Sequence, residues 1–186
     1  MSQQEQPSKA QALDQEATFK AAMSQFPSGV TVITTHSASG EPVGMTASAF
    51  ISVSLNPPLV LESVAKTAQM HAHLSEQPRY AVSILSAGQA PVSNHFAGWG
   101  AEGYQPPLSE LGGLPTIEGS LARLACPIVQ RVDAGDHTLF IARVDEAELE
   151  QGDQDPLIYA KRGYHTLTST SQAQSSQAQT SPKGER

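Results

Sequence analysis

The sequence is poor in cysteine, in tryptophan and in positive charge. Its single cysteine, Cys126, excludes an internal disulfide, which fits a reducing compartment. Eleven basic residues against 18 acidic ones give a formal net charge of -7. Nucleic-acid surfaces need clustered Lys and Arg to displace phosphate counterions, so we expect no nucleic-acid partner.

Long apolar runs are also missing. No stretch approaches the roughly 18 residues that span a bilayer, and the first eight residues lack the apolar segment of a signal peptide. We therefore expect a cytoplasmic protein that does not bind membranes. At 186 residues and 39% hydrophobic, the chain is long enough for one core. We expect a disordered tail over residues 1–16, one domain over 17–167 and a disordered Ser- and Gln-rich tail over 168–186.

Short strands dominate the predicted secondary structure. A helix is predicted over Leu13–Phe26, followed by a hairpin of Val30–Thr35 and Val43–Val53. Short helices are predicted over Thr67–Leu74, capped by Thr67, and over Pro91–Ala97. Further strands are predicted over Leu59–Ser63, Tyr80–Leu85, Ile117–Ala125, Pro127–Asp133, His137–Leu149, Leu157–Tyr159 and Tyr164–Leu167. This pattern favours a mainly β fold with flanking helices, a closed antiparallel barrel.

The segment Gly98–Gly103 matches the G-x-G-x-x-G pattern of dinucleotide-binding βαβ units. That pattern requires a strand before it and a helix after it, whereas here a helical segment precedes it and Pro106 and Pro107 follow. We therefore reject the βαβ interpretation and predict a long loop over residues 98–115. Because this loop contains Trp99 and long loops are often functional, it is a candidate border of a ligand pocket.

Two other segments are candidate ligand contacts. In Gly44–Phe50 the small side chains would let a flat ring lie against the strand, although an ordinary strand explains them too. Ser63–Thr67 brings hydroxyls, backbone N–H groups and one ammonium to a predicted helix start, where a phosphate can sit. The alternative there is a plain helix cap.

The remaining histidines and the cysteine carry weaker signals. His71 and His73 are two residues apart and diverge on a helix, so we expect a solvated helix face and no metal site. Cys126 lies between two predicted strands and is most simply a small buried hydrophobe. His137 begins a strand directly after Asp136, so a turn histidine bonded to that carboxylate is one interpretation.

The order of these motifs, together with G-D-H-T at Gly135–Thr138 and P-L-I-Y-x-x-R-G-Y at Pro156–Tyr164, resembles the flavin reductase-like family. Members are the small components of two-component monooxygenases. The resemblance covers residues 18–167. It implies an FMN-binding split β-barrel, a Greek-key antiparallel barrel, that is usually a homodimer with flavin near the interface.

The resemblance also implies roles for individual residues. His137 would position the nicotinamide without taking a proton, since hydride passes directly between the cofactors. Arg162 and Tyr164 would join it in binding the reductant. The implied flavin contacts are Pro27, Ser28, Gly29, Val30, Met45, Thr46, Ala47, Ser48, Ala49, Phe50, Ser63, Lys66, Thr67 and Phe96.

The function implied is hydride transfer from NADH or NADPH to FMN or FAD by an NAD(P)H-dependent flavin reductase. Reduced flavin would then diffuse to a separate monooxygenase. Two alternatives stay open: an oxidoreductase that retains FMN, like pyridoxamine-phosphate oxidase, and a flavin-binding module without turnover. The sequence does not decide between FMN and FAD. It favours NADH over NADPH, because no localised arginine pair is present to bind a 2′-phosphate.

Overall fold

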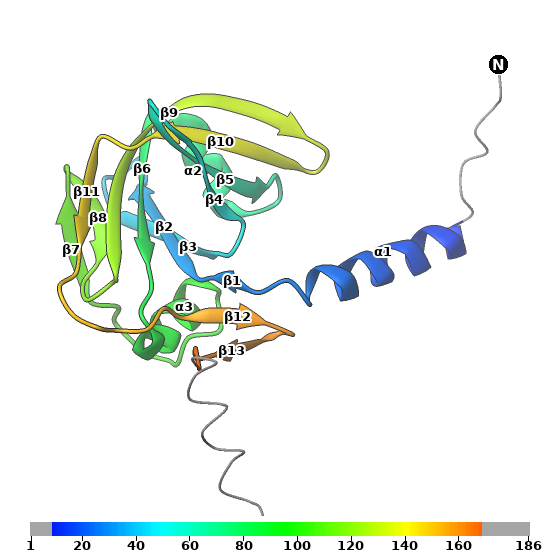
Figure 1. The fold of residues 1–186 in the computed structure, drawn as a ribbon. Coiled ribbons are helices and arrows are strands. Elements are labelled where there is room, and N and C mark those ends of the chain that lie inside the picture. Colours follow the sequence, from blue (N-terminus) through cyan, green and yellow to red (C-terminus); the bar gives the residue numbers. More distant parts are fainter. Residues whose placement is uncertain (1–8, 169–186) are drawn as a thin grey trace, which may run out of the picture.

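The structure is a computed structural model that describes residues 9–168 (Figure 1). Strands make up most of its regular secondary structure, as predicted, with three α-helices in this part of the chain. The elements are α1 (Lys9–Met23), β1 (Ser28–Gly29), β2 (Thr31–His36), β3 (Pro42–Ala47), β4 (Phe50–Leu55), β5 (Pro58–Ala65), α2 (Gln69–Glu76), β6 (Arg79–Ile84), the 3₁₀ helix η1 (Ala87–Gln89), α3 (Ala90–Phe96), β7 (Leu108–Leu111), β8 (Leu114–Ile117), β9 (Ala122–Ala134), β10 (His137–Arg143), β11 (Glu146–Leu149), β12 (Ile158–Ala160) and β13 (Gly163–His165).

The main sheet curls into a barrel that hydrogen bonds do not close. Its eight strands include the path β3-β2-β6-β9-β10-β5-β4, with β11 added on β9, and all its described pairings are antiparallel. β3 and β4 stand at opposite ends of this path, yet only Ser48 and Ala49 join them. Such a link spans at most roughly 11 Å, so the two edges meet at this corner. The split-barrel prediction is confirmed, whereas full closure of the sheet is not observed.

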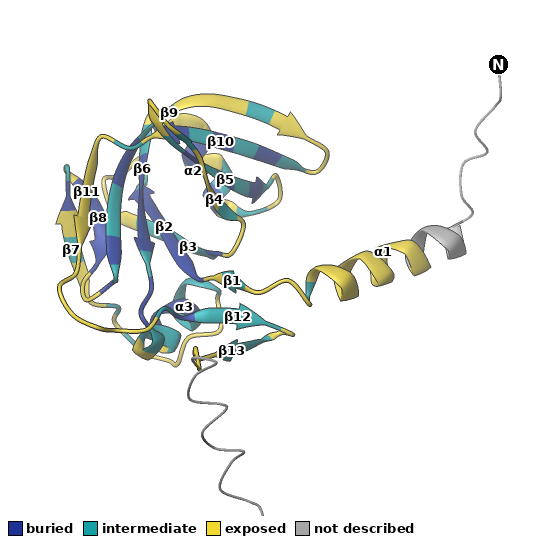
Figure 2. Ribbon diagram, in the orientation of Figure 1, coloured by how far each residue is buried: buried dark blue, intermediate teal, exposed yellow. Residues whose placement is uncertain are grey.

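Buried residues lie along most strands of the barrel (Figure 2), and their two largest clusters hold it together. The first fills its interior and includes Ile33, Tyr80 and Phe140, each with no exposed surface. The second, around Leu85 and Ile117, packs under α3 and the small sheet β1-β12-β13. Cys126 belongs to the first group, as predicted, and burial raises the pKa of its thiol to about 12.

Four strand predictions were wrong in their boundaries. The predicted strand Val43–Val53 is β3 and β4, separated by the corner at Ser48. The strands predicted on either side of Cys126 form one strand, β9. Pro127 is the last residue of β9 that pairs with β6, and the residues after it pair with β10. At this change of partner the missing N–H of proline costs little. The predicted strand His137–Leu149 divides at Val144 into β10 and β11, which pair with different halves of β9.

The predicted loop over residues 98–115 was also wrong in its second half, where β7 and β8 form a hairpin. Gly112 and Gly113 turn it with φ of +57° and +74°, the geometry of a two-residue hairpin turn. The βαβ interpretation is correctly rejected, because α3 precedes Gly98–Gly103 and β7 follows it.

α1 begins at Lys9, so it extends into the predicted tail 1–16 and ends three residues before Phe26. Residues 1–8 and 169–186, including most of the other predicted tail, lie outside the described residues. α1 projects away from the barrel, and Phe19 and Met23 on it are exposed (Figures 1 and 2). Within residues 9–168, no helix has the length and apolar character that crossing a membrane requires.

Candidate active site

A cavity of about 200 Å³ opens at the corner between β3 and β4. β3, α3, the loop after α3 and the β12-β13 hairpin enclose it, so chain segments far apart in sequence meet there. Its lining is mainly apolar with several hydroxyl groups, which suits one face of a planar ring. The lining residues are Val30, Thr46, Ala47, Ser48, Ser93, Ala97, Trp99, Tyr159 and Tyr164.

Five of these residues were predicted as site residues, and α3 fixes two of them in place. The Thr46 hydroxyl donates a hydrogen bond to the Ser93 carbonyl at 2.6 Å. The Tyr164 hydroxyl lies 2.8 Å from Ser93 Oγ and 2.9 Å from Asn94 Oδ1. Tyr159 packs edge-on against the Tyr164 ring with centroids 5.7 Å apart. The cavity walls are therefore held by hydrogen bonds and aromatic packing rather than by loop conformation alone.

Trp99 occupies the mouth of this cavity, in agreement with the prediction that its loop borders a pocket. Its backbone N–H donates to the Asn94 carbonyl at 2.8 Å, and Gly98 before it adopts φ of +82°. A Cβ at Gly100 would lie 2.8 Å from His95 Cα, so the loop after Trp99 passes close to α3. This backbone places the indole beside the cavity while 74% of the residue stays exposed.

Sequence reasoning missed Ser93, Ala97 and Tyr159. Tyr159 stands inside the closing P-L-I-Y pattern and offered an aromatic signal. Ser93 and Ala97 face the cavity only because α3 docks on β3, a contact that no local pattern carries.

The other predicted flavin contacts on β1, β3 and β4 do not line this cavity. Met45 and Phe50 pack against the barrel core. Ser28 and Gly29 form β1 and pair with β12, and Pro27 precedes them. Phe96 faces a neighbouring pocket, and Ala49 lies in the corner itself.

The turn after β5 lies close to this corner. The Ser63 N–H donates to the Ala49 carbonyl at 3.4 Å, which connects the end of β5 with the link between β3 and β4. Lys66 follows three residues later and is half-exposed. The turn after β5 therefore follows a strand that is hydrogen-bonded to the corner beside the cavity.

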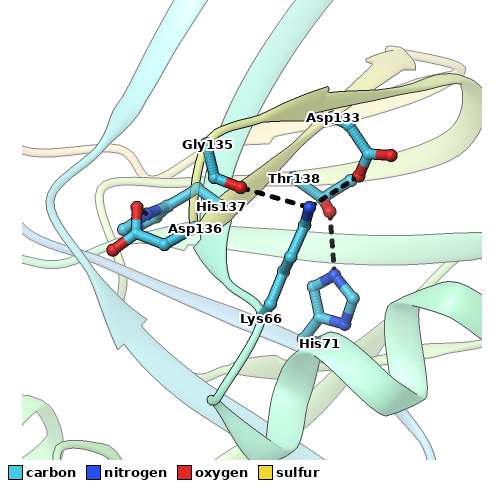
Figure 3. A network of polar contacts seen from close by, with 7 residues as sticks. All are labelled: Lys66, His71, Asp133, Gly135, Asp136, His137 and Thr138. Atoms are coloured by element: carbon cyan, nitrogen blue, oxygen red, sulfur yellow. Dashed lines mark hydrogen bonds and ion pairs between the residues drawn. The ribbon is translucent and has the colours of Figure 1, made fainter.

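Lys66 takes part in a polar network with the β9-β10 turn (Figure 3). Its Nζ lies 3.1 Å from Asp133 Oδ1 and donates to the Gly135 carbonyl at 3.2 Å, and its backbone N–H donates to the Asp136 carbonyl at 2.9 Å. The prediction that Thr67 caps α2 was wrong, because the N-cap is Ala68 and no side-chain hydrogen bond caps the helix. The Lys66 ammonium is thus held where it can also meet an anionic group.

His137 lies at the same turn, at the first position of β10, where it pairs with Ala65 (Figure 3). Its Nδ1 is 2.7 Å from Asp136 Oδ1, and this hydrogen bond lowers the pKa of the Asp136 carboxyl. The contact expected of a turn histidine is therefore present. It orients a half-exposed imidazole whose Nε2 has no hydrogen-bond partner within residues 9–168.

Two other predicted positions, His71 and Arg162, take places that differ from the prediction. His71 is not on a solvated face: its Nε2 is 2.9 Å from Thr138 Oγ1, and its ring packs edge-on against Phe140. Arg162 lies in the β12-β13 turn with φ of +64° and lines a hollow beside α1, so it joins neither His137 nor the cavity. Among the residues that the structure describes, no group of three metal-ligating side chains occurs.

The chain belongs to the flavin reductase-like family, since the model of the flavin reductase like domain matches residues 23–168. It is 41% identical over 160 residues to an NADH-dependent flavin reductase of Rhodococcus sp, covering 83% of this chain and 90% of that protein. It is 41% identical over 150 residues to the reductase component of 4-hydroxyphenylacetate 3-monooxygenase from Thermus thermophilus, covering 80% and 95%. The solved structure of flavin reductase PheA2 superposes with a TM-score of 0.78 at 45% identity, covering 83% of this chain and 99% of the other.

Proposed function

We propose that this protein is an NADH-dependent flavin reductase that supplies reduced flavin to a separate monooxygenase. The observation that carries the proposal is the continuity of one barrel edge: an apolar ring-sized cavity, an ammonium at Lys66 and an oriented imidazole at His137. The relatives named as NADH-dependent flavin reductase and as monooxygenase reductase component support it.

The residues present fit a flavin. Ala47 and Val30 would give the ring an apolar wall, and Ser48 and Tyr164, which line the same cavity, carry hydroxyls that can bond ring nitrogens and oxygens. Lys66 would hold the phosphate by a charge-assisted hydrogen bond. When bound, the flavin supplies the chemistry by accepting a hydride from the nicotinamide.

The protein itself orients the two rings and limits water between them. His137, fixed by Asp136, would place the nicotinamide by a hydrogen bond or ring contact and needs to move no proton. Trp99 at the cavity mouth would shield one side of the bound ring.

A steady-state assay that crosses FMN and FAD with NADH and NADPH tests the function. We expect NADH oxidation that depends on added flavin and exceeds the rate with NADPH. An enzyme that co-purifies with FMN and needs no added flavin would support the oxidase-like alternative. Tight flavin binding without NADH oxidation would support the binding module.

Lys66→Ala should weaken FMN binding about tenfold or more and leave riboflavin binding nearly unchanged. Charge-assisted hydrogen bonds contribute roughly 1.5–3 kcal/mol, and riboflavin lacks the phosphate. Calorimetric titration with both ligands measures this difference. Lys20→Ala is the matched control, because Lys20 is an exposed lysine paired with Glu16 on α1. Equal weakening of FMN and riboflavin would place the phosphate elsewhere.

A homodimer is also part of the proposal. The outer edge strand β4 exposes Ile51, Val53 and Leu55, with 57%, 48% and 91% of each residue accessible. Exposed apolar patches of this kind mark association surfaces, and α1 extends beyond the barrel with Phe19 and Met23 uncovered. A cytoplasmic location is proposed as well, supported by the free thiol of Cys126.

Ile51→Glu should convert the proposed dimer into a monomer, because it places a charge in the apolar face of β4. Analytical ultracentrifugation should give twice the chain mass of 19.7 kDa for the natural protein and about that chain mass for the variant. Glu41→Gln, at an exposed turn before β3, is the control. A natural protein that sediments as a monomer at all accessible concentrations would refute the dimer.

A further inference from the structure

Glu62 carries a carboxyl group inside the barrel that the proposed reaction does not use. It lies on β5 between Val60 and Val64, on the face of the strand that points into the barrel, and has no exposed surface. Neither of its carboxyl oxygens has a hydrogen-bond partner within residues 9–168. Since buried polar groups are nearly always hydrogen-bonded, this exception needs a physical explanation.

Aromatic rings flank this carboxyl on both sides of β5. Glu62 pairs with Phe140 on β10 and with Phe50 on β4, and residues paired in this way share one face of the sheet. Two polar groups from other elements contact the Phe140 ring. The Arg131 guanidinium on β9 lies 6.0 Å from its centre, and His71 on α2 packs edge-on against it. Neither forms a hydrogen bond with the Glu62 carboxyl.

The other titratable groups in this part of the core stay neutral when Glu62 ionises. They are Tyr80 on β6 and Cys126 on β9, and burial raises the pKa of both, that of Cys126 to about 12. Burial likewise raises the pKa of the Glu62 carboxyl from 4.5 to about 8. Glu62 is therefore mostly neutral at pH 7 and becomes charged just above it.

The residue after Glu62 connects β5 with the corner of the flavin cavity. The Ser63 N–H donates to the Ala49 carbonyl at 3.4 Å, and Ala49 follows Ser48, which lines the cavity. N–H···O hydrogen bonds are usually about 2.7–3.2 Å long, so this one is weak. The same N–H lowers the pKa of the Glu62 carboxyl, so it interacts with that group too. The Ala49 carbonyl and the Glu62 carboxyl therefore compete for one donor.

The protonation state of Glu62 decides this competition. A neutral carboxyl is a weak acceptor, so the Ser63 N–H stays with the Ala49 carbonyl. A buried carboxylate is a strong acceptor that lacks any other partner here, so it draws the Ser63 N–H toward itself. Loss of the bond to Ala49 would free the link between β3 and β4, the segment that places Ser48 in the cavity wall.

We propose that neutral Glu62 is a positioning residue for the flavin site, because it leaves the Ser63 N–H bonded to Ala49 and so keeps the corner in the shape that binds the flavin ring. Ionisation of Glu62 would release the corner and weaken ring binding. The inference rests on the proposed function in placing the flavin ring in this cavity. It depends neither on the phosphate position at Lys66 nor on hydride transfer.

The NMR signal of the Ser63 amide tests the exchange of hydrogen bonds without any flavin. In the natural protein this signal should shift with a midpoint near pH 8, and in Glu62→Gln it should stay constant. Glu76→Gln, exposed at the end of α2, is the control and should titrate like the natural protein. A Ser63 amide that does not titrate in the natural protein would overturn the proposal.

Riboflavin binding measures the consequence for the site. Riboflavin lacks the phosphate, so titration of Lys66 does not affect it. The natural protein should bind it about tenfold more weakly at about pH 9 than at pH 7, since roughly one tenth of the Glu62 carboxyls stay neutral one pH unit above their pKa. Glu62→Gln should bind it almost equally at both pH values. Circular dichroism at each pH ensures that only folded proteins are compared.

Calorimetry in two buffers of different ionisation enthalpy counts the protons that binding takes up. At about pH 8 the natural protein should take up about half a proton per riboflavin, and Glu62→Gln should take up none. Equal pH dependence in both proteins, or no riboflavin binding by folded Glu62→Gln at pH 7, would overturn the proposal. A protein with the expected pH dependence but without reductase activity would retain this inference and lose the proposed function. An active reductase without that dependence would do the reverse.

Discussion

Glu62→Gln should stabilise the protein above about pH 8 and change its stability little below about pH 4.5. Glu62 points into the barrel with no exposed surface, and neither carboxylate oxygen has a hydrogen-bond partner within residues 9–168. Burial raises the pKa of this carboxyl from 4.5 to about 8. The Ser63 N–H, which donates to the Ala49 carbonyl, lowers the pKa of this carboxyl by less than burial raises it.

The direction in which stability changes with pH follows from proton binding by the Glu62 carboxyl. The folded state binds this proton more tightly than the unfolded state, so the stabilisation is complete below pH 4.5 and is lost as the pH rises to about 8. A pKa shift of this size lowers the free energy of unfolding by on the order of 5 kcal/mol between low and high pH. Glutamine stays neutral and nearly isosteric, so the variant removes the charge without removing the buried polar group.

Urea denaturation across this pH range measures the effect. The natural protein should lose stability with rising pH, and Glu62→Gln should follow a flatter curve. Glu76→Gln, exposed at the end of α2, should leave the curve of the natural protein unchanged. Parallel curves for the natural protein and Glu62→Gln would mean that Glu62 is ionised and solvated in the folded state.

His137→Ala should slow hydride transfer from NADH or raise the NADH requirement by roughly tenfold, while flavin affinity and melting temperature stay nearly unchanged. A hydrogen bond that positions the nicotinamide contributes about 1 kcal/mol or more, and the proposed flavin contacts lie on other elements. Stopped-flow reduction of bound flavin at several NADH concentrations separates the two effects.

His137→Asn and His137→Gln should recover part of the rate, because an amide can still donate a hydrogen bond beside the ring. Asp136→Asn preserves a partner for the imidazole and should have a smaller effect than His137→Ala. A histidine that serves only the turn would behave differently: every His137 variant would lose thermal stability, and rates would follow the folded fraction. Unchanged kinetics in a stable His137→Ala variant would remove it from the site.

The sequence predicted the fold class and many of the strands because β-branched runs such as Thr31–Thr35 are local signals. It did not predict the β7-β8 hairpin, since its strands are four residues long and its turn depends on two adjacent glycines. Nor did it predict the break at Ser48, where small residues continue a strand-like pattern. That break exists because β3 and β4 join opposite ends of a curved sheet, which is a property of the whole barrel.

The sequence predicted site residues that lie in one contiguous motif, and it missed those that reach the site through contacts between distant elements. Thr46, Ala47 and Ser48 lie in one segment and reach the cavity together, whereas Ser93 reaches it only through the docking of α3. The burial of Glu62 could have been predicted from the strand pattern of the sequence, but it was not. Strand alternation places it on the same face as Val60 and Val64, both buried, although a carboxylate at that position suggests exposure.

The anaerobic reduction of free flavin by NADH tests the central claim most directly. With oxygen removed, purified protein at catalytic concentration should bleach the visible absorbance of an excess of FAD or FMN. The rate should be proportional to protein concentration and should vanish when either NADH or protein is omitted. Folded protein that binds flavin yet leaves FAD, FMN and riboflavin oxidised in the presence of NADH and NADPH would contradict the account.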